Sequence, residues 1–308
     1  MADTIYEHYT TQFASNWINR CQQKISRLAR YVTPAPFVGE RKRYSRTAAM
    51  SMTQIVTRKG DTPITDAVDD LRWIYMKGYE IGTDLDQFDA QLLGELVLPT
   101  STRIQQFAYA ANRTKDAAII EAATGAVMTG ELGTTSTAFP TSTNQIAVNY
   151  VETGSPADSN LTLGKLRKAR QLMQDAEIDI DGMDGTEEMP VFVLGGSQIQ
   201  SLLASTTVTS AEYNTVRALV DGKIDTFLGF RFVRCAGALG YDGSSHIRTC
   251  VAFLPSAVLF NDGPKTTTID RIPEKQNKIQ IYGTALFGGM RLHDEGVVTV
   301  LCDEDVVA

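Results

Sequence analysis

Apolar residues near the start of the chain recur at the spacing of an amphipathic helix. Between residues 3 and 31 they fall every three or four positions, which places them along one stripe. The prolines of segment 33–40 cannot continue a helical hydrogen-bond ladder, so the helix has to end before them. The pattern therefore predicts an N-terminal arm, 1–45, made of one helix and a linker. Packing on a neighbouring subunit and packing on the same chain both fit this arm.

The following apolar segments alternate with polar residues, as β-strands do. Residues 48–58 and 71–81 show this alternation, and the polar connection between them contains Gly60 and Pro63. The pattern predicts an extended β-hairpin loop spanning 46–82. A two-stranded hairpin is marginally stable by itself, so we expect it to pack against something else.

Charge is unevenly divided along this predicted hairpin. Basic residues come first and acidic ones follow, at Arg41, Lys42, Arg43, Arg46, Arg58 and Lys59, and then at Asp61, Asp66, Asp69 and Asp70. Either the two arms neutralise each other within one hairpin, or each arm meets the opposite charge on another subunit. For the second interpretation the candidate intersubunit contacts are Arg58, Lys59, Asp69, Asp70, Trp73 and Tyr75.

A long helix is predicted over 103–126, between a proline and a glycine-rich segment, with a shorter helix over 84–96 before it. Thr102 and Gln105 match a capping box, and the long helix would extend for roughly 36 Å. Small side chains along one face would let a sheet or another backbone approach closely. The candidate packing residues of this helix are Ala111, Arg113, Asp116, Ala118, Ala122 and Gly125. Arg113 and Asp116 also have the spacing of an ion pair on one helix face.

Beyond residue 160 the predicted helices and strands alternate, which indicates a compact α/β block. Helices are predicted over 161–178, 197–205 and 211–220, strands over 189–196 and 249–255, and a hairpin over 223–235. The final segment, 277–303, is expected to form strands separated by Gly288-Gly289 and by a polar turn. Segment 129–160 is expected to be irregular apart from one strand over 146–151.

Composition narrows the classes of protein. Of the 308 residues 43% are hydrophobic, and the formal net charge is -7, which argues against a disordered chain and against a broadly basic one. No apolar run reaches the roughly 18 residues of a membrane span, and the N-terminus lacks the pattern of a secretory signal. The four cysteines are far apart in sequence, so we expect free thiols in a reducing environment.

Candidate catalytic and metal-binding residues do not converge on one site. The chain has three histidines in separate segments, at His8, His246 and His293. Gly195-Gly196 before a predicted helix resembles a phosphate loop, but a turn capped by Ser197 explains it. The acids of 175–184 approach the spacing of a calcium loop without its closing glutamate. The sequence thus predicts a protein that is not an enzyme, with no catalytic residue, no cofactor and no metal.

Several motifs along the chain match one known family in the same order. The long helix carries Ala111-Asn112-Arg113, Asp116, Ile119, Ala122 and Gly125. Segments 219–233 and 283–304 match the same family further along the chain. Together these motifs resemble the major capsid protein of tailed bacteriophages, with its Hong Kong-97-type coat fold. The resemblance extends over most of the chain, from about residue 3 to residue 304.

The resemblance implies an α+β fold with an N-terminal arm, an extended hairpin loop, a long spine helix and two domains. A peripheral β-sheet domain would comprise 83–155 and 264–308, and a compact α/β axial domain 156–263. The resemblance further implies self-assembly into hexamers and pentamers of an icosahedral shell that encloses double-stranded DNA. Assembly would take place in the cytoplasm of a host bacterium, with a portal and without a membrane. Because the arm is short, the resemblance implies a separate scaffolding protein or none.

Two alternatives to a phage coat protein stay open from the sequence. An encapsulin-like compartment would have the same fold and would enclose an enzyme in place of a genome. A cytosolic α/β enzyme would use residues 190–260, with Gly195-Gly196 binding a phosphate. The enzyme alternative leaves the arm and the hairpin without a purpose, so we expect a structural protein of the virion.

Overall fold

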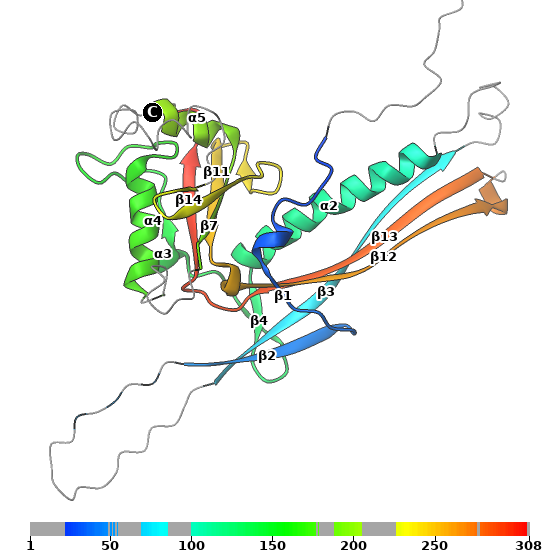
Figure 1. The fold of residues 1–308 in the computed structure, drawn as a ribbon, viewed down its shortest axis with the longest axis horizontal. Helices are drawn as coiled ribbons and strands as arrows, with labels where there is room; N and C mark the ends of the chain where they lie inside the picture. The colour runs from blue at the N-terminus through cyan, green and yellow to red at the C-terminus, as the bar shows by residue number, and fades with distance from the viewer. Residues whose placement is uncertain are drawn as a thin grey trace, which may run out of the picture. The chain divides into compact units, whose positions relative to one another are not determined.

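The computed structural model describes residues 22–48, 50, 52, 54, 69–85, 100–176, 178, 188–204, 226–275 and 278–306. These residues form two compact units, drawn in Figure 1. The smaller unit contains the described parts of 1–25, 79–112 and 265–285, and the larger unit those of 26–78, 113–264 and 286–308. The division into arm, hairpin, peripheral and axial domains stays a prediction.

Four α-helices lie within the described residues. They are α2 (Thr100–Thr124), α3 (Thr141–Asn144), α4 (Leu163–Asp175) and α5 (Gly196–Ala204). Short 3-10 turns are η2 (Ala29–Tyr31), η3 (Pro255–Ala257) and η4 (Pro273–Lys275). In the described part of the chain, none of the helices has both the length and the apolar character that crossing a membrane needs.

The first of two sheets has the strand order β1-β12-β13-β3-β4-β5, with β2 paired to β3. Its strands are β1 (Thr33–Pro34), β2 (Arg41–Thr47), β3 (Asp69–Leu85), β4 (Val127–Thr129), β5 (Thr135–Thr137), β12 (Val258–Ile272) and β13 (Lys278–Arg291). Three of these strands, β3, β12 and β13, contribute residues to both units, as does α2. In the smaller unit Phe107 of α2 packs against the fully buried Ile281 of β13.

The second sheet lies within the larger unit and has the order β6-β14-β11-β7-β9-β8, with β10 paired to β11. Its strands are β6 (Gln145–Ile146), β7 (Val191–Leu194), β8 (Thr226–Phe227), β9 (Phe230–Arg234), β10 (Tyr241–Asp242), β11 (Ile247–Phe253) and β14 (Val297–Asp303). All four residues of β7 are buried, which agrees with its central place and its uninterrupted apolar sequence. The ring of Phe192 meets those of Phe230 and Phe232 edge-on, each with centroids 5.7 Å apart.

Helix α4 covers this second sheet because its apolar positions recur at helical spacing. Leu166, Ala169 and Met173 are buried along one face, and α4 packs against β14 (Figure 1). Thr162 caps the helix, since its side chain accepts a hydrogen bond from the backbone N–H of Lys165. The Lys165 ammonium is buried as well and donates to the carbonyl of Leu301 in β14 at 2.9 Å. This bond ties the helix to the sheet.

The predictions from local pattern are confirmed for most of these elements. The long helix is confirmed as α2, the helix over 161–178 as α4, and the strand over 189–196 as β7. The hairpin over 223–235 is confirmed from residue 226 onward, where β8 and β9 pair across a two-residue turn. That turn contains Leu228 and Gly229 at positive φ, as a tight hairpin of right-handed twist requires. The predicted helices over 84–96 and 211–220 fall largely or wholly outside the described residues.

Two strand predictions and one helix boundary are wrong. The strand that pairs with β3 covers Arg41–Thr47, ahead of the predicted 48–58, most of which lies outside the described residues. Gly288-Gly289 does not interrupt β13. The two glycines lack a side chain and so let other strands and helix α2 of the same chain pack closely against β13, and they do not form a turn. Helix α2 begins at Thr100, so Thr102 lies inside it and is not its cap.

Three further expectations are wrong. Within the described residues, the segment from 22 to 28 forms no α-helix, and only η2 follows it. The strand expected over 146–151 is limited to β6, because the chain turns after Ile146 and the N–H of Tyr150 bonds the carbonyl of Ala147. Helix α5 begins at Gly196, so Ser197 lies inside the helix and is not its cap.

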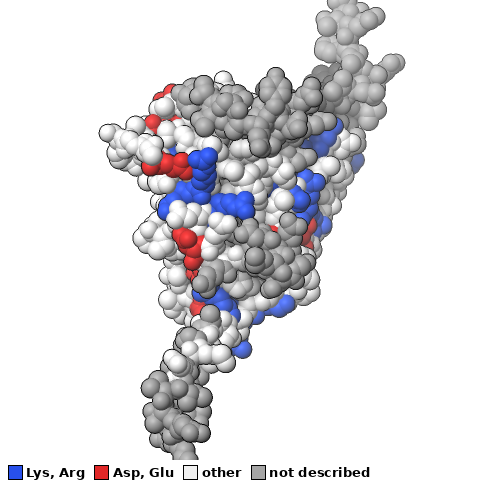
Figure 2. Space-filling view, turned by 60° about the vertical axis from the view of Figure 1, so that its left-hand side comes forward, with Lys and Arg blue, Asp and Glu red and all other residues white. Residues whose placement is uncertain are grey.

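Charged side chains on the face seen in Figure 2 form separate groups, several with basic and acidic residues next to each other. The surface in this view is not one continuous basic field. This distribution agrees with the net charge of -7.

Candidate functional site

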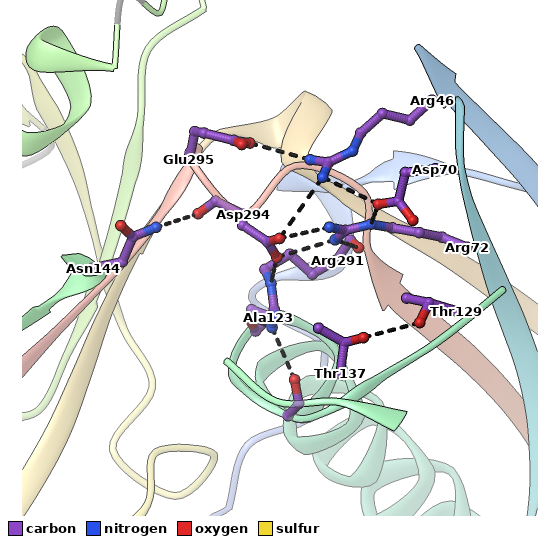
Figure 3. Close-up of polar contacts among 11 residues, drawn as sticks. Arg46, Asp70, Arg72, Ala123, Thr129, Thr137, Asn144, Arg291, Asp294 and Glu295 are labelled. Carbon is purple, nitrogen blue, oxygen red and sulfur yellow. Dashed lines mark hydrogen bonds and ion pairs between the residues drawn. The ribbon is translucent and has the colours of Figure 1, made fainter. Parts of the chain in front are cut away.

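An arginine that is almost fully buried lies at the centre of the first sheet. Arg72 of β3 is only 2% exposed, although arginine is rarely buried without a partner. Its guanidinium binds the carboxylate of Asp294 through two nitrogens, with Nη1 3.0 Å from Oδ1 (Figure 3). The same Nη1 donates to the carbonyl of Arg291 at 2.8 Å. A two-point contact of this kind fixes both distance and orientation.

A second buried arginine, Arg291 at the end of β13, closes the C-terminal end of helix α2. Its Nη1 donates to the carbonyls of Ala123 at 2.9 Å and Gly125 at 2.8 Å. Its Nε donates to Asp294, and the guanidinium lies over the ring of Phe139, 5.0 Å from the centroid. The last turn of α2 has no basic residue of its own, so Arg291 supplies the positive charge that a helix C-terminus favours.

Further groups extend this arrangement, which we call the ionic cluster. It consists of Arg46, Asp70, Arg72, Arg291, Asp294 and Glu295. Arg46 lies 3.1 Å from Asp70 and 3.3 Å from Glu295, and Asp70 also lies 3.1 Å from Arg72. Three arginines thus face three carboxylates. Asn144 of α3 holds the turn from the other side, donating to the Asp294 carbonyl at 2.6 Å.

The pKa values in the ionic cluster follow from this geometry. Burial by itself would raise the pKa of Asp294, but hydrogen bonds and charges from Arg72 and Arg291 outweigh it and lower the pKa to about 2. Burial would lower the pKa of Arg72, yet Asp294 and Asp70 raise it above its ordinary value. Burial lowers the pKa of Arg291, against the opposing effect of Asp294. Both guanidiniums stay charged at neutral pH, because arginine keeps its proton far above neutrality.

Stability should therefore depend on pH through Asp294. Because its folded pKa is below the ordinary value of 3.8, its contribution is present above about pH 4 and disappears as pH falls towards 2. A shift from 3.8 to about 2 corresponds to roughly 2 kcal/mol of unfolding free energy. We expect Asp294→Asn to flatten the decline in thermal stability measured between pH 4 and pH 2. The same decline in wild type and variant would contradict this role.

A second polar cluster anchors residues 26–28 of the N-terminal arm to helix α2. Asp116 of α2 is 1% exposed and accepts hydrogen bonds from Ser26 Oγ and from the backbone N–H groups of Arg27 and Leu28. These bonds explain why the helix predicted to reach residue 31 does not form, since the carboxylate binds N–H groups of that segment. The Cys235 thiol also points at Asp116, 3.7 Å away, and burial together with the carboxylate raises its pKa to about 11.

The other candidate packing residues of α2 differ in their surroundings. Ala122 is buried, and β13 passes so close that a Cβ on Gly289 would lie 2.7 Å from the Ala122 Cβ. Ala111 and Ala118 are half-buried, and Arg113 is exposed. Gly125 follows the last helical residue and donates to the Glu121 carbonyl. Pairing of Arg113 with Asp116 stays a prediction.

The candidate contacts of the hairpin make bonds within their own chain. Asp70 belongs to the ionic cluster, and Asp69 accepts from the Thr47 hydroxyl at 2.7 Å. Trp73 Nε1 donates to the Gly130 carbonyl at 2.7 Å, and the Tyr75 hydroxyl to that of Gly133 at 3.0 Å. Arg58 and Lys59 lie outside the described residues. For Arg46 and Asp70, the two arms of one hairpin therefore neutralise each other's charge.

The residues considered for catalysis or metal binding have structural partners. The N–H of Gly195 bonds the side chain of Gln198 at 3.1 Å, and Ser197 accepts from Asn160 at 3.0 Å, so this helix start is already occupied. Burial lowers the pKa of His293, and the charge of Arg46 adds to the effect. No group of metal-ligating side chains with the geometry of an ion site occurs among the described residues. The acids of 175–184 lie mostly outside them, as do His8 and Cys21.

The three described cysteines, Cys235, Cys250 and Cys302, are buried and free.

Comparison with known proteins decides the family. A family model described as phage capsid protein matches residues 5–304. The chain belongs to the phage capsid protein family. It is accordingly a structural major coat protein of the virion shell. Among curated protein sequences none matches this coat protein.

Solved capsid structures share the coat protein's fold at low sequence identity. The capsid of cyanophage Pam1 is 13% identical, with 99% of each chain covered and a TM-score of 0.70. The head of Helicobacter pylori bacteriophage KHP40 is 10% identical, with 99% of each chain covered and a TM-score of 0.67. The capsid of Ralstonia phage GP4 is 11% identical, covering 96% of this chain and 95% of its own, with a TM-score of 0.64. The α+β coat fold expected from the sequence is confirmed.

The ionic cluster was not identified from the sequence of the coat protein. The only sign of it in the sequence is Arg72, a charged residue within an apolar strand, because a charge buried there needs a partner. Asp294 and Glu295 belong to the polar turn within segment 277–303, and a polar turn gives no sign of a buried ion pair. Arg291 is three residues from Asp294, but Arg72 and Arg46, which bind Asp294 and Glu295, are more than two hundred residues away, so no local spacing connects these pairs.

Proposed function

We propose that copies of this coat protein form the hexamers and pentamers of an icosahedral shell that encloses phage double-stranded DNA. The observation that carries the proposal is the family match over residues 5–304, which leaves almost no part of the chain for another function. Solved phage capsids cover nearly the whole chain as well, which supports the same conclusion.

The polar clusters suit a structural protein, because they hold strands and a helix in fixed relative positions. Arg72 and Arg291 bind Asp294 from two strands of the first sheet, and Arg291 also binds the end of α2. Buried ion pairs often add little net stability relative to apolar residues of similar volume. We propose that this cluster instead holds β3, β13 and the end of α2 in one relative position. We propose that the coat protein has no catalytic function and needs no cofactor, since these charges are used for structure.

Other partners follow from the same proposal. Shell assembly is expected in the cytoplasm of the host bacterium, with a portal and a separate scaffolding protein. The hairpin is proposed to contact neighbouring subunits through Arg58, Lys59, Asp69, Asp70, Trp73 and Tyr75. Strand β2 supports this, because its residues 41–43 are exposed, and in the described chain β3 is the only strand paired with it.

The coat protein expressed alone should form closed shells or shell fragments, visible by electron microscopy. We expect Arg58→Glu with Lys59→Glu, and separately Asp69→Lys, to reduce shell formation, because charge pairs steer subunits into register. Asp70 is left unchanged, because its place in the ionic cluster would confuse assembly with folding. A monodisperse monomer of the wild type at high concentration would contradict the proposed function.

Mixing the hairpin variants separates contacts between subunits from contacts within one hairpin. If neither variant assembles alone and the mixture does, the pairing is between subunits. If the mixture fails and a chain with all three reversals assembles, the pairing is internal and the proposed intersubunit contact is wrong. Circular dichroism of each variant serves as the control for folding.

A further inference from the structure

Strand β2 leaves one row of its backbone groups unpaired within the described chain. There it pairs with β3 alone (Figure 1). The N–H of Met76 bonds the carbonyl of Glu40 at 2.9 Å, and this pair continues the register of the two strands. Bonded and non-bonded pairs alternate along an antiparallel ladder, so the N–H and C=O groups of Arg41, Arg43 and Ser45 are directed away from β3. We call these backbone groups the open edge.

The open edge belongs to a strongly basic strand. The seven residues of β2 include four bases and no acid. Arg46 is engaged in the ionic cluster, but in the described chain neither Arg41 nor Arg43 has a carboxylate at ion-pair distance. Arg41 donates to the carbonyl of Leu132 at 3.2 Å, a partner without net charge. Arg41 and Arg43 are exposed and lie on one face of the strand, because alternate residues of a strand share a face.

We propose that the open edge accepts an extended acidic segment of a second copy of the coat protein, which adds a strand to the first sheet; this inference rests on the proposed function. Unpaired N–H and C=O groups of an edge strand are a template for another chain. Main-chain hydrogen bonds supply the affinity of such strand addition, and alternate side chains supply its specificity. Acids at every second position of the added strand would face Arg41 and Arg43.

Charge favours a second copy as the occupant. The whole chain has a formal net charge of -7 and β2 contributes +4, so the rest of the chain carries -11. A second copy therefore offers many acids to the basic strand, whereas two β2 strands would repel each other. The contact is accordingly between different surfaces of the two copies. Head-to-tail contacts of this kind close into rings when the rotation between copies permits it, as hexamers and pentamers require.

Hydrogen exchange of the purified wild-type coat protein tests the open edge directly. In unassembled chains we expect fast exchange at the amides of Arg43 and Ser45, and slow exchange at those of Tyr44 and Arg46, which bond to β3. Assembly should slow Arg43 and Ser45 about fivefold or more, because their N–H groups gain hydrogen bonds. No slowing overturns the proposal. Slowing that occurs only after another phage protein is added also overturns it, because the occupant is then not a second copy.

Proline at position 45 tests the backbone separately from the charge. Ser45→Pro removes an N–H that is directed away from β3, so the ladder between β2 and β3 stays intact. Ser45→Ala keeps the N–H and is the matched control. Sedimentation velocity measures the concentration at which half of the coat protein is assembled. We expect Ser45→Pro to raise it about tenfold or more, and Ser45→Ala less than about twofold. Equal behaviour of the two variants overturns strand addition, and circular dichroism verifies that both are folded.

The charge of the strand has its own test. Arg43→Gln should raise the same concentration about two- to fivefold. Arg167→Gln removes an exposed charge that pairs with Glu152 beside α4, so it should change the concentration less than about twofold. Equal effects of the two variants overturn the role of the basic strand. If Arg43→Glu assembles better with wild type than either does alone, β2 pairs with β2 and the head-to-tail contact is wrong.

Failure of this inference and failure of the proposed function give different results. Electron microscopy of the wild type should show shells, and exchange at Arg43 and Ser45 should be slow within them. Shells with fast exchange at both amides overturn strand addition alone. Absence of shells from the wild type overturns the proposed function itself.

Discussion

Replacing Asp294 by alanine is expected to lower the free energy of unfolding by about 3–5 kcal/mol. The variant leaves Arg72 and Arg291, which are 2% and 0% exposed, without the carboxylate that both bind. Among the described residues Arg291 would then have no carboxylate at ion-pair distance, and Arg72 would retain only the partly exposed Asp70. A buried charge without its partner costs far more free energy than a surface ion pair contributes. Typical domains are stable by only 5–15 kcal/mol, so much of the variant should be unfolded or insoluble. Thermal unfolding and the soluble fraction on expression measure the effect.

The neighbouring carboxylate provides the control for this experiment. Glu295 is 53% exposed, and its ion pair is with Arg46 at 3.3 Å. Exposed pairs contribute about 0–1 kcal/mol, so Glu295→Ala should leave stability almost unchanged. Similar losses in the two variants would show that burial of Arg72 and Arg291 does not decide the cost, and the role given to Asp294 would be wrong.

Replacing Gly289 by valine is expected to be the second severe change. A Cβ at this position would lie 2.7 Å from the Cβ of Ala122, 3.0 Å from the ring of Phe260 and 3.3 Å from the Leu259 carbonyl. Overpacking usually costs about 1–3 kcal/mol, and the backbone contact here limits how far the neighbours are able to move. We therefore expect a loss at the upper end of that range or beyond it, measured by thermal unfolding. Shell formation should fall with it.

Two companion variants test whether the clash is the cause. At Gly240 an added Cβ meets nothing within 4 Å, so Gly240→Val should cost little. Ala122→Gly removes one of the clashing atoms, so combining it with Gly289→Val should cost less than the sum of the two single changes. Strict additivity would show that Ala122 and β13 are not in contact, and that the small residue at this point of α2 serves another purpose.

The sequence by itself determined the kind and order of many elements. Helices α2 and α4 follow from apolar spacing, and β7 and β11 from short apolar runs, because these signals depend on residues within one turn or one strand. The separation of basic and acidic residues along the hairpin predicted that opposite charges would pair, and Arg46 and Asp70 do so. It did not predict the register of the two strands. The family resemblance rested on the same local motifs and is confirmed by the match over residues 5–304.

Only the tertiary structure decided where long-range partners meet. Arg72 binds Asp294 from 222 residues away, and Arg291 binds the Ala123 carbonyl from 168 residues away, and no spacing rule reports such contacts. Asp116 was identified as a helix packing residue, but its role depends on the N–H groups of Arg27 and Leu28, which overrode the helical pattern of that segment. Gly288-Gly289 had the signature of a turn, and close packing against β3 and α2 made it part of a strand. In each case a buried charge or a steric contact outweighed a local preference of a few tenths of a kcal/mol to about 1 kcal/mol per residue, which is why the sequence pattern alone did not reveal it.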